Sequence, residues 1–237
     1  MGNAVKRSAR RDRARATRLR IIEASAVLFA EAGYAGTTME AIARAARVAV
    51  QTVYFVFHTK GELLIETMSV LAWGPEPRSE AARGWVQLAF ETSGGARQLA
   101  IAVDAGAEVY RRAAPLFGAL TAASSVDPEV RTAWQRIVDE RRAGMGRLIE
   151  LIHGRGELRE GVSSSYAADV MVGLHRHELF LAFTRECGWS VETYKAWLFA
   201  TLCRQLLPDE VAAAALEPGS PATAGMSFEA ALRDLPS

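Results

Sequence analysis

The segment from Thr37 to Leu63 reads TTMEAIARAARVAVQTVYFVFHTKGEL and decides the fold. Thr37 followed three residues later by Glu40 is a capping box, which predicts that a helix opens here and runs to about Ala46. A second, short helix is expected over 49–56, after a turn of only two or three residues. Two short helices joined by a tight turn, with basic residues around them, form a candidate helix-turn-helix.

Amphipathic helices are predicted on both sides of this segment. Upstream, apolar residues recur at steps of three and four, which places them on one face of a helix over 18–32 that ends at Gly33. They are Leu19, Ile22, Ala26, Phe29 and Ala30. Downstream, a helix over 62–73 has Leu63, Leu64, Met68 and Leu71 available for burial.

Basic residues concentrate at the N-terminus, although the net charge of the chain is only +1. Residues 1–60 hold 11 Lys or Arg against 4 Asp or Glu, and within the first 20 residues only Asp12 is acidic. A basic arm beside a nearly neutral body is typical of a protein that binds nucleic acid, and a solvated tail without a partner is the alternative. We expect residues 1–17 to form a disordered basic arm.

Apolar, glycine and hydroxyl residues recur at fixed spacing over residues 18–63. They are Ile22, Phe29, Gly33-Tyr34, Thr37-Thr38, Ile42-Ala43, Val48, Thr52-Val53-Tyr54, Phe57, Lys60 and Leu63. This pattern resembles the DNA-binding domain of TetR-family transcriptional regulators. The resemblance implies an all-α protein of about nine to ten helices, with an N-terminal three-helix helix-turn-helix domain and a C-terminal helical ligand-binding and dimerisation domain.

The helix-turn-helix geometry suggests which side chains contact DNA. The first residues of the short helix face base edges in the major groove, where Gln51 can bond adenine and Val50 or Ala49 can touch a thymine methyl group. The resemblance implies phosphate contacts for Thr38, Tyr54 and Lys60, with Tyr54 packing inward, although Tyr54 also fits a plain core aromatic. The expected DNA-binding residues are Thr37, Thr38, Arg44, Arg47, Ala49, Val50, Gln51, Thr52, Tyr54, Phe55 and Lys60. Of these, Thr37 fits a helix cap better than a DNA contact.

The chain departs from the family pattern at the turn and in the short helix. The family usually has glycine where this chain has Arg47, and often Ser or Thr where it has Ala49. A non-glycine residue in a left-handed turn costs about 1 kcal/mol, which a fold tolerates. Phe55 and Val56 stand where polar aromatics are common, so the operator sequence stays open.

Beyond a break at Gly74-Pro75-Glu76-Pro77, the pattern predicts further helices and no strands. They cover about 80–92, 96–112, 115–125, 128–153, 165–186 and 191–207. Asp127 before Pro128 is expected to be the N-cap of one of them. The expected organisation is an arm over 1–17, a DNA-binding domain over 18–61, a ligand-binding and dimerisation domain over 62–207, and an Ala/Pro/Gly-rich tail over 208–237.

The resemblance implies a homodimer held together by the helices at 165–186 and 191–207. Residues 179–183 are apolar without interruption, and a helix that is apolar nearly all round is buried on more than one side. The candidates for the dimer face, or for the core behind it, are Val170, Leu174, Phe180, Leu181, Phe183, Trp197, Leu198, Thr201, Leu202 and Gln205.

A small-molecule effector is expected to bind among residues 62–153, with help from residue 171 onwards. Aromatic, apolar and a few polar side chains at helical spacing could line the site, although such residues are more often plain core. They are Trp85, Phe90, Val103, Asp104, Tyr110, Phe117, Trp134, Arg141, Met145, Met171 and His175. We expect a small apolar or aromatic effector.

Catalytic, cofactor and metal sites are not predicted. His175 and His177 are two apart on a predicted helix and point to different sides, and no third ligand or HExxH motif accompanies them. No Ser-His-Asp order, phosphate loop or GxGxxG is present. The longest charge-free stretch, Ala113–Val126, is too short to span a bilayer, and Cys187 and Cys203 are the only cysteines, so a cytoplasmic protein is expected.

The sequence therefore predicts a ligand-responsive transcriptional regulator that is not an enzyme. A repressor released from a palindromic double-stranded DNA operator is the main hypothesis, and a ligand-dependent activator is its alternative. From other classes, a helical small-molecule-binding protein or enzyme that no longer reads DNA stays open, as does a non-specific nucleic-acid coat.

Overall fold

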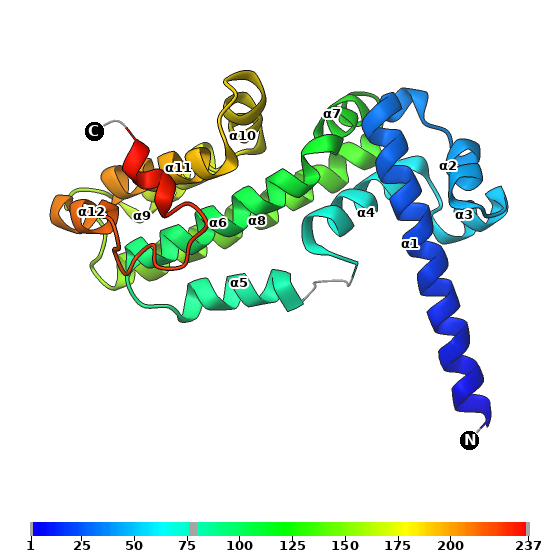
Figure 1. Cartoon of the computed structure of the whole chain (residues 1–237), viewed down its shortest axis with the longest axis horizontal. Helices are drawn as coiled ribbons and strands as arrows, with labels where there is room; N and C mark the ends of the chain where they lie inside the picture. The colour runs from blue at the N-terminus through cyan, green and yellow to red at the C-terminus, as the bar shows by residue number, and fades with distance from the viewer. Residues whose placement is uncertain (1, 76–79, 236–237) are drawn as a thin grey trace. The chain divides into compact units, whose positions relative to one another are not determined.

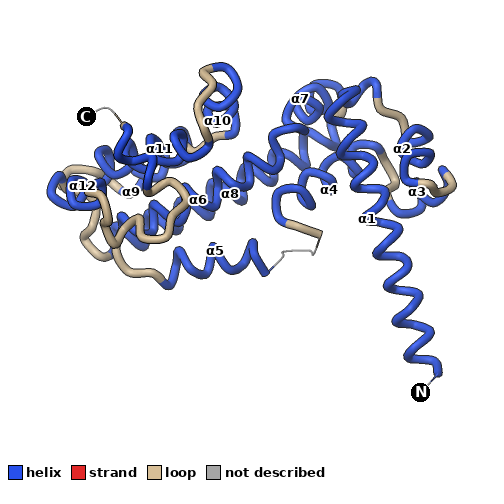
Figure 2. The backbone as a smooth tube through the Cα atoms, viewed as in Figure 1, coloured by secondary structure: helices blue, strands red, loops and turns tan. Residues whose placement is uncertain are grey.

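The structure is a computed structural model that describes residues 2–75 and 80–235, with the backbone alone at 2–7, 80–83 and 85. Across these ranges every regular element is helical, which confirms the all-α prediction (Figure 1, Figure 2). The chain divides into two compact units. Unit 1 comprises Met1–Pro77 and Pro115–Ile137, and unit 2 comprises Arg78–Ala114 and Val138–Ser237.

Unit 1 contains the predicted helix-turn-helix. Its elements are α1 (Gly2–Gly36), α2 (Met39–Ala46), α3 (Val50–Val56), α4 (Lys60–Trp73), α7 (Phe117–Val126) and the first turns of α8 (Pro128–Gly154), with the last residues of the 3₁₀ turn η1 (Ala114–Leu116) leading into α7. Both α4 and α7 pack on α1. The core between these helices consists of fully buried apolar side chains: Ile21, Ile22, Phe29, Ile42, Val53, Phe57, Leu63 and Leu64.

Three predictions for unit 1 are corrected by the structure. The described part of the predicted arm, residues 2–17, is helical and forms the first turns of α1, as its alanine and arginine content favours. The N-cap of α2 is Thr38, which accepts from the N–H of Ala41 at 3.1 Å, and not Thr37. The DNA-binding unit does not end at residue 61, because α4 and residues 115–137 share its apolar core.

Gly33 interrupts α1 where the sequence predicts the end of a helix. Its backbone has φ 68° and ψ −177°, a conformation open almost only to glycine. The chain then turns through Tyr34 towards α2. The glycine therefore fixes where the helix-turn-helix begins.

Unit 2 is built around α6 (Gly95–Ala113), which packs against α5 (Glu80–Glu91) and α11 (Val191–Leu206). The remainder of α8, α9 (Ser164–Leu174), α10 (His177–Leu181), the π-helical turn η2 (Ala182–Glu186), α12 (Asp209–Leu216) and the 3₁₀ turn η3 (Ala230–Asp234) complete it. Apolar residues of α6 and α11 form its core, including Leu99, Val103, Leu198, Phe199 and Leu202.

The helix predicted over 165–186 is broken in the structure. His175 and Arg176 leave helical geometry, with ψ angles of 61° and 147°, between α9 and α10. The carbonyl oxygen of His175 accepts hydrogen bonds from the hydroxyl of Tyr110 at 2.9 Å and from Nη1 of Arg141 at 2.7 Å. These two side chains replace the backbone N–H that would donate to this carbonyl in a continuous helix. The hydrophobic periodicity of the sequence does not reveal such a long-range hydrogen bond. This break and the added α12 raise the number of helices above the nine to ten expected.

The C-terminal segment is packed and structured, although its composition predicts a tail. Phe228 is fully buried, with its ring centroid 5.6 Å from that of Phe199 on α11. The guanidinium of Arg97 donates to the carbonyl oxygens of Ala222 and Ala224 at 3.1 and 2.8 Å. This segment therefore belongs to the core of unit 2, because an aromatic anchor offsets its Gly and Pro content.

No helix within the described ranges is long and apolar enough to cross a membrane.

Candidate functional site

The turn between α2 and α3 has the tight geometry that places two helices for DNA recognition. Arg47 adopts φ 55° and ψ 49°, the left-handed conformation expected for it, and its N–H donates to the carbonyl oxygens of Ala43 and Arg44. Ala49, the N-cap of α3, has extended backbone and offers no side-chain acceptor. Fully buried Val53 holds α3 against the core.

One face of α3 carries large exposed side chains. Gln51 is exposed, and Phe55, four residues later on the same face, is 84% exposed. Tyr54 is 46% exposed, which corrects the expectation that it packs inward and excludes a core aromatic at this position. Val50 and Thr52 are half-buried and Ala49 is exposed. An exposed phenylalanine next to an exposed amide is a surface suited to base edges.

Basic side chains are present on α2, in the turn after it and at the start of α4. Arg44 and Arg47 are exposed on and just after α2. The ammonium of Lys60 donates to the carbonyl oxygens of Tyr34 at 2.8 Å and Thr37 at 3.0 Å, and lies 4.2 Å from the centre of the Tyr34 ring. Two of its three N–H donors are thereby used, and its charge is fixed beside the start of α2.

Thr37 is unavailable to DNA. Its side chain is buried, and its hydroxyl donates to the carbonyl oxygens of Gly33 at 2.7 Å and Leu28 at 3.0 Å. These bonds tie Thr37 to the backbone on both sides of the last turn before Gly33. Thr37 is therefore a structural residue, which corrects its assignment as a DNA contact.

Asp127 connects the start of α8 to the loop before α2, a role beyond the predicted N-cap. Its Oδ1 accepts from the N–H of Glu129 at 3.0 Å, which confirms the cap, and its Oδ2 accepts from the hydroxyl of Tyr34 at 2.7 Å. The hydrogen bond from Tyr34 lowers the pKa of Asp127. A Cβ at Gly61 would lie 2.7 Å from a methyl carbon of Val130, so α4 approaches α8 closely here. No sequence motif signals either contact.

Three of the predicted effector residues lie together in unit 2. Arg141 on α8 donates from Nη1 both to the hydroxyl of Tyr110 on α6 and to the carbonyl oxygen of His175. The ring of His175 lies 5.6 Å from that of Tyr110. Val103 and Met171 are buried in the same unit. A polar group made of Tyr110, Arg141 and His175, defined here as the Arg141 cluster, therefore lies inside the helical domain.

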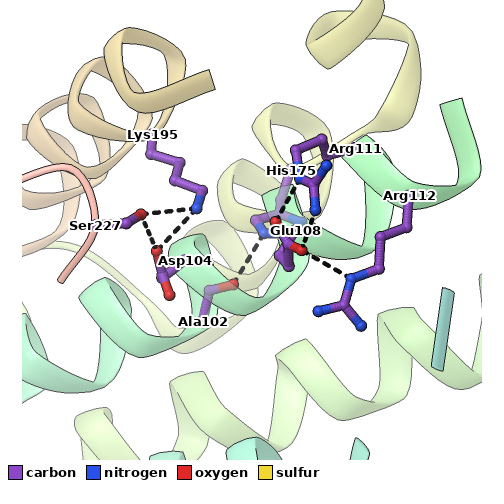
Figure 3. Close-up of polar contacts among 8 residues, drawn as sticks. All are labelled: Ala102, Asp104, Glu108, Arg111, Arg112, His175, Lys195 and Ser227. Atoms are coloured by element: carbon purple, nitrogen blue, oxygen red, sulfur yellow. Dashed lines mark hydrogen bonds and ion pairs between the residues drawn. The ribbon is translucent and has the colours of Figure 1, made fainter. Parts of the chain in front are cut away.

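The other predicted effector residues do not join this cluster. Phe117 and Trp134 belong to unit 1, where their ring centroids lie 6.4 Å apart. Asp104 bonds Lys195 at 3.0 Å and Ser227 at 2.7 Å (Figure 3). Phe90 and Met145 are half-buried, and the side chain of Trp85 lies outside the described residues.

His175 is held as a neutral imidazole. Its Nε2–H donates to the carbonyl oxygen of Ala102 at 3.2 Å (Figure 3), and α6 makes room for the ring at Gly106, where a Cβ would lie 1.9 Å from its Cε1. Burial lowers the pKa of His175 to about 4, and the charge of Arg141 contributes. His177 bonds Glu178 at 3.0 Å, and the described residues contain no group of three or more potential metal ligands.

Two known sequence profiles match this chain, and they cover both units. Residues 21–67 match the family described as bacterial regulatory proteins, tetR family, and residues 96–186 match the tetracyclin repressor-like C-terminal domain. The chain belongs to the TetR family. Its members are transcription regulators, so the chain is a DNA-binding regulator and not an enzyme.

Solved structures of transcriptional regulators share the fold, one of them described as a putative TetR-family regulator. A regulator from Mesorhizobium loti has 24% identity and a TM-score of 0.61, over 80% of this chain and 95% of its own. One from Saccharomonospora viridis, solved with choline, has 17% identity and a TM-score of 0.63, over 81% and 97% of the two chains. The regulator FadR from Bacillus subtilis, solved with stearoyl-CoA, has 18% identity and a TM-score of 0.62, over 78% and 96%. Among curated proteins, none matches.

The neutral state of His175 predicts a pH-dependent stability. The unfolded chain binds the proton near pH 6.5 and the folded chain only near pH 4, so stability falls as the pH drops through this window. The loss amounts to about 3 kcal/mol in the free energy of unfolding. We expect urea unfolding at pH 4 to 7 to show this slope in the wild type and not in His175→Gln. Parallel pH profiles for the two proteins would contradict the assignment.

The empty cap of α3 predicts a stabilising substitution. Ala49 already has the extended backbone of an N-cap, so Ala49→Ser supplies the missing acceptor and raises the free energy of unfolding by about 1 kcal/mol. The control is Ala45→Ser, an exposed position within α2 where serine lowers stability by about 0.5 kcal/mol. Thermal unfolding compares them, and equal effects at both positions would exclude the cap.

Proposed function

We propose that this TetR-family regulator is a homodimeric repressor that a small molecule releases from a palindromic operator. The observation that carries the DNA half of the proposal is the face of α3 with Gln51 and Phe55, beside the basic Arg44, Arg47 and Lys60. In this proposal α3 enters the major groove with that face towards the bases. Thr38, at the N-terminus of α2, and exposed Tyr54 contact phosphates.

The dimer proposed here uses α9, α10 and α11. Phe180, Leu198 and Leu202 are buried within one chain and belong to the core behind the face. The remaining predicted residues keep part of their surface for a partner: Val170, Leu174, Leu181, Phe183, Trp197, Thr201 and Gln205. A two-fold dimer presents two α3 helices to half-sites about 34–36 Å apart, which is why a palindromic operator is expected.

The effector half of the proposal rests on the Arg141 cluster. It lies within the domain whose profile the chain shares with tetracyclin repressor-like proteins, and two structural relatives were solved with choline and stearoyl-CoA. A ligand can release the repressor from DNA only to the extent that it binds the released conformation more tightly than the DNA-bound one.

The cytoplasm is the proposed location, with Cys187 and Cys203 as free thiols.

The N-terminal arm is proposed to add phosphate contacts. The first 20 residues carry eight Lys or Arg against Asp12, and the described part of the arm is a helix with exposed side chains. Deleting residues 1–17 should weaken operator binding and flatten its dependence on salt, because the slope falls by about 0.9 for each phosphate that the protein no longer neutralises. Anisotropy titrations at several salt concentrations measure this slope, and an unchanged slope would remove the arm from the interface.

Transcript levels test the direction of control. We expect deletion of the gene to raise transcription from its neighbouring promoter, and complementation with the wild type to restore repression. Complementation with Phe55→Ala should not restore it. Lower transcription after deletion would identify an activator, and no change at any promoter would remove the regulatory proposal.

A further inference from the structure

Hydrogen-bond donors outnumber acceptors around the Arg141 cluster. A guanidinium has five N–H donors, and within the described residues only Nη1 of Arg141 makes hydrogen bonds, to the hydroxyl of Tyr110 and the carbonyl oxygen of His175. Neither acceptor is charged. None of the ion pairs found among those residues gives Arg141 a carboxylate. Its half-buried positive charge is therefore uncompensated.

A second donor next to the cluster has no acceptor at all. Tyr194 on α11 is fully buried, and in the part of the chain that the structure describes its hydroxyl makes no hydrogen bond. Its ring meets Phe180 edge-on at 5.2 Å, and Phe180 lies 5.9 Å from Tyr110. Burial raises the pKa of Tyr194, Tyr110 adds to the rise, and the positive charge of Arg141 opposes it. A buried hydroxyl without an acceptor is costly and calls for an explanation.

The acidic groups nearby are already paired. Glu108 accepts from Arg111 and Arg112 at 2.7 and 2.8 Å, which lowers its pKa to about 2 (Figure 3). Glu178 is held by Arg176 at 2.5 Å and by His177 at 3.0 Å. Neither of these two carboxylates is therefore free to pair with Arg141 or to accept from Tyr194.

We propose that the effector is a small carboxylic acid with an apolar or aromatic body, whose carboxylate binds Arg141 and the hydroxyl of Tyr194. This rests on the proposed function and names the effector class for it. A carboxylate matches the planar fork of arginine and accepts from the phenol at the same time. The apolar body packs on Phe180, whose ring lies 5.9 Å from that of Tyr110 and 5.2 Å from that of Tyr194. A cationic effector would be repelled by Arg141.

The same geometry explains how the acid acts on the fold. Arg141 also donates to the carbonyl oxygen of His175, at the break between α9 and α10. A carboxylate competes with this carbonyl for the guanidinium, so binding changes the hydrogen bonding at the break. The helices on either side are those proposed to form the dimer, which makes the break the point where acid binding and dimer geometry meet.

Matched pairs of ligands test the proposal on the full-length protein. Calorimetry with phenylacetate against phenylacetamide, and with octanoate against octanamide, compares each acid with its neutral isostere. We expect the acids to bind at least about tenfold more tightly than the amides, since the amide cannot form the charged hydrogen-bonded pair. Acids that do not bind at millimolar concentration, or amides that bind equally well, would overturn the proposal.

Three variants locate the site. Arg141→Gln should lose acid binding, whereas Arg142→Gln, the exposed neighbour paired with Asp169, should keep it. Tyr194→Phe removes a hydroxyl that has no acceptor in the free protein, so it should raise Tm without ligand and weaken acid binding severalfold. Unchanged acid binding in Arg141→Gln and Tyr194→Phe would contradict the site. If the protein binds an operator specifically and only choline releases it, the acid proposal is wrong and the repressor proposal is retained. If the protein binds no operator, the proposed function itself is wrong.

Discussion

We expect the Phe55→Ala variant to bind operator DNA about 10- to 100-fold more weakly than the wild type and to unfold at the same temperature. Phe55 is 84% exposed on α3, so it stabilises nothing in the free protein. Burying a phenylalanine side chain against DNA contributes about 1.5–3 kcal/mol, which the alanine forfeits. Fluorescence anisotropy measures the affinity. Val126→Ala, a 73% exposed apolar position at the end of α7, serves as the matched control and should bind normally.

Uracil substitution in the operator identifies what Phe55 contacts. Phenylalanine has no hydroxyl to bond a phosphate, so its partner in the groove is apolar, and the thymine methyl group is the apolar group that the major groove presents. Replacing single thymines by uracil should lower the affinity of the wild type at one position in each half-site. The same replacement should not lower the affinity of Phe55→Ala any further. Equal sensitivity to uracil in both proteins would exclude the methyl contact.

We expect the Gly106→Ala variant to lose about 3 kcal/mol in the free energy of unfolding. A Cβ at position 106 would lie 1.9 Å from Cε1 and 2.3 Å from Nε2 of His175. The His175 ring cannot move away freely, because its Nε2–H donates to the carbonyl oxygen of Ala102. The backbone of His175 is also held, since its carbonyl oxygen accepts from Tyr110 and Arg141. Overpacking therefore disturbs both α6 and the break between α9 and α10. Urea unfolding measures the change.

Gly146→Ala is the matched control for this variant. Gly146 is also a helical glycine, in α8, and a Cβ there meets nothing within 4 Å. Alanine at this position should raise stability by about 0.5–1 kcal/mol through helix propensity. Similar effects for both glycines would mean that the contact between Gly106 and His175 does not constrain unit 2.

The sequence predicts the helix-turn-helix well because its signals are local. Caps, a three-and-four apolar spacing and a tight turn determine α2 and α3 to within two residues, although the exposure of Tyr54 on α3 was not predicted. The cap at Thr38 in place of Thr37 was not predictable from the motif alone. Which of two adjacent threonines caps α2 depends on the carbonyls to which Thr37 donates, and hence on backbone that only the fold defines.

Long-range contacts determine the features of unit 2 that sequence patterns do not predict. The break at His175 depends on Tyr110 and Arg141, which lie 65 and 34 residues away along the chain. The packing of the C-terminal segment depends on one aromatic residue, Phe228, within a composition that otherwise predicts a tail. Tyr194, whose hydroxyl carries the effector proposal, looks like any core aromatic in the sequence. Such features require the tertiary arrangement and leave no periodic trace.

Binding of the full-length protein to its own upstream intergenic DNA tests the central claim most directly. Fluorescence anisotropy at two salt concentrations compares this DNA with a scrambled duplex of the same composition. We expect binding to the upstream DNA to be tighter by at least about 10³-fold, and this preference to be abolished in the Gln51→Ala/Phe55→Ala double variant. Weak binding to both duplexes, equally sensitive to salt, would contradict a sequence-specific regulator that reads DNA through α3 at this site.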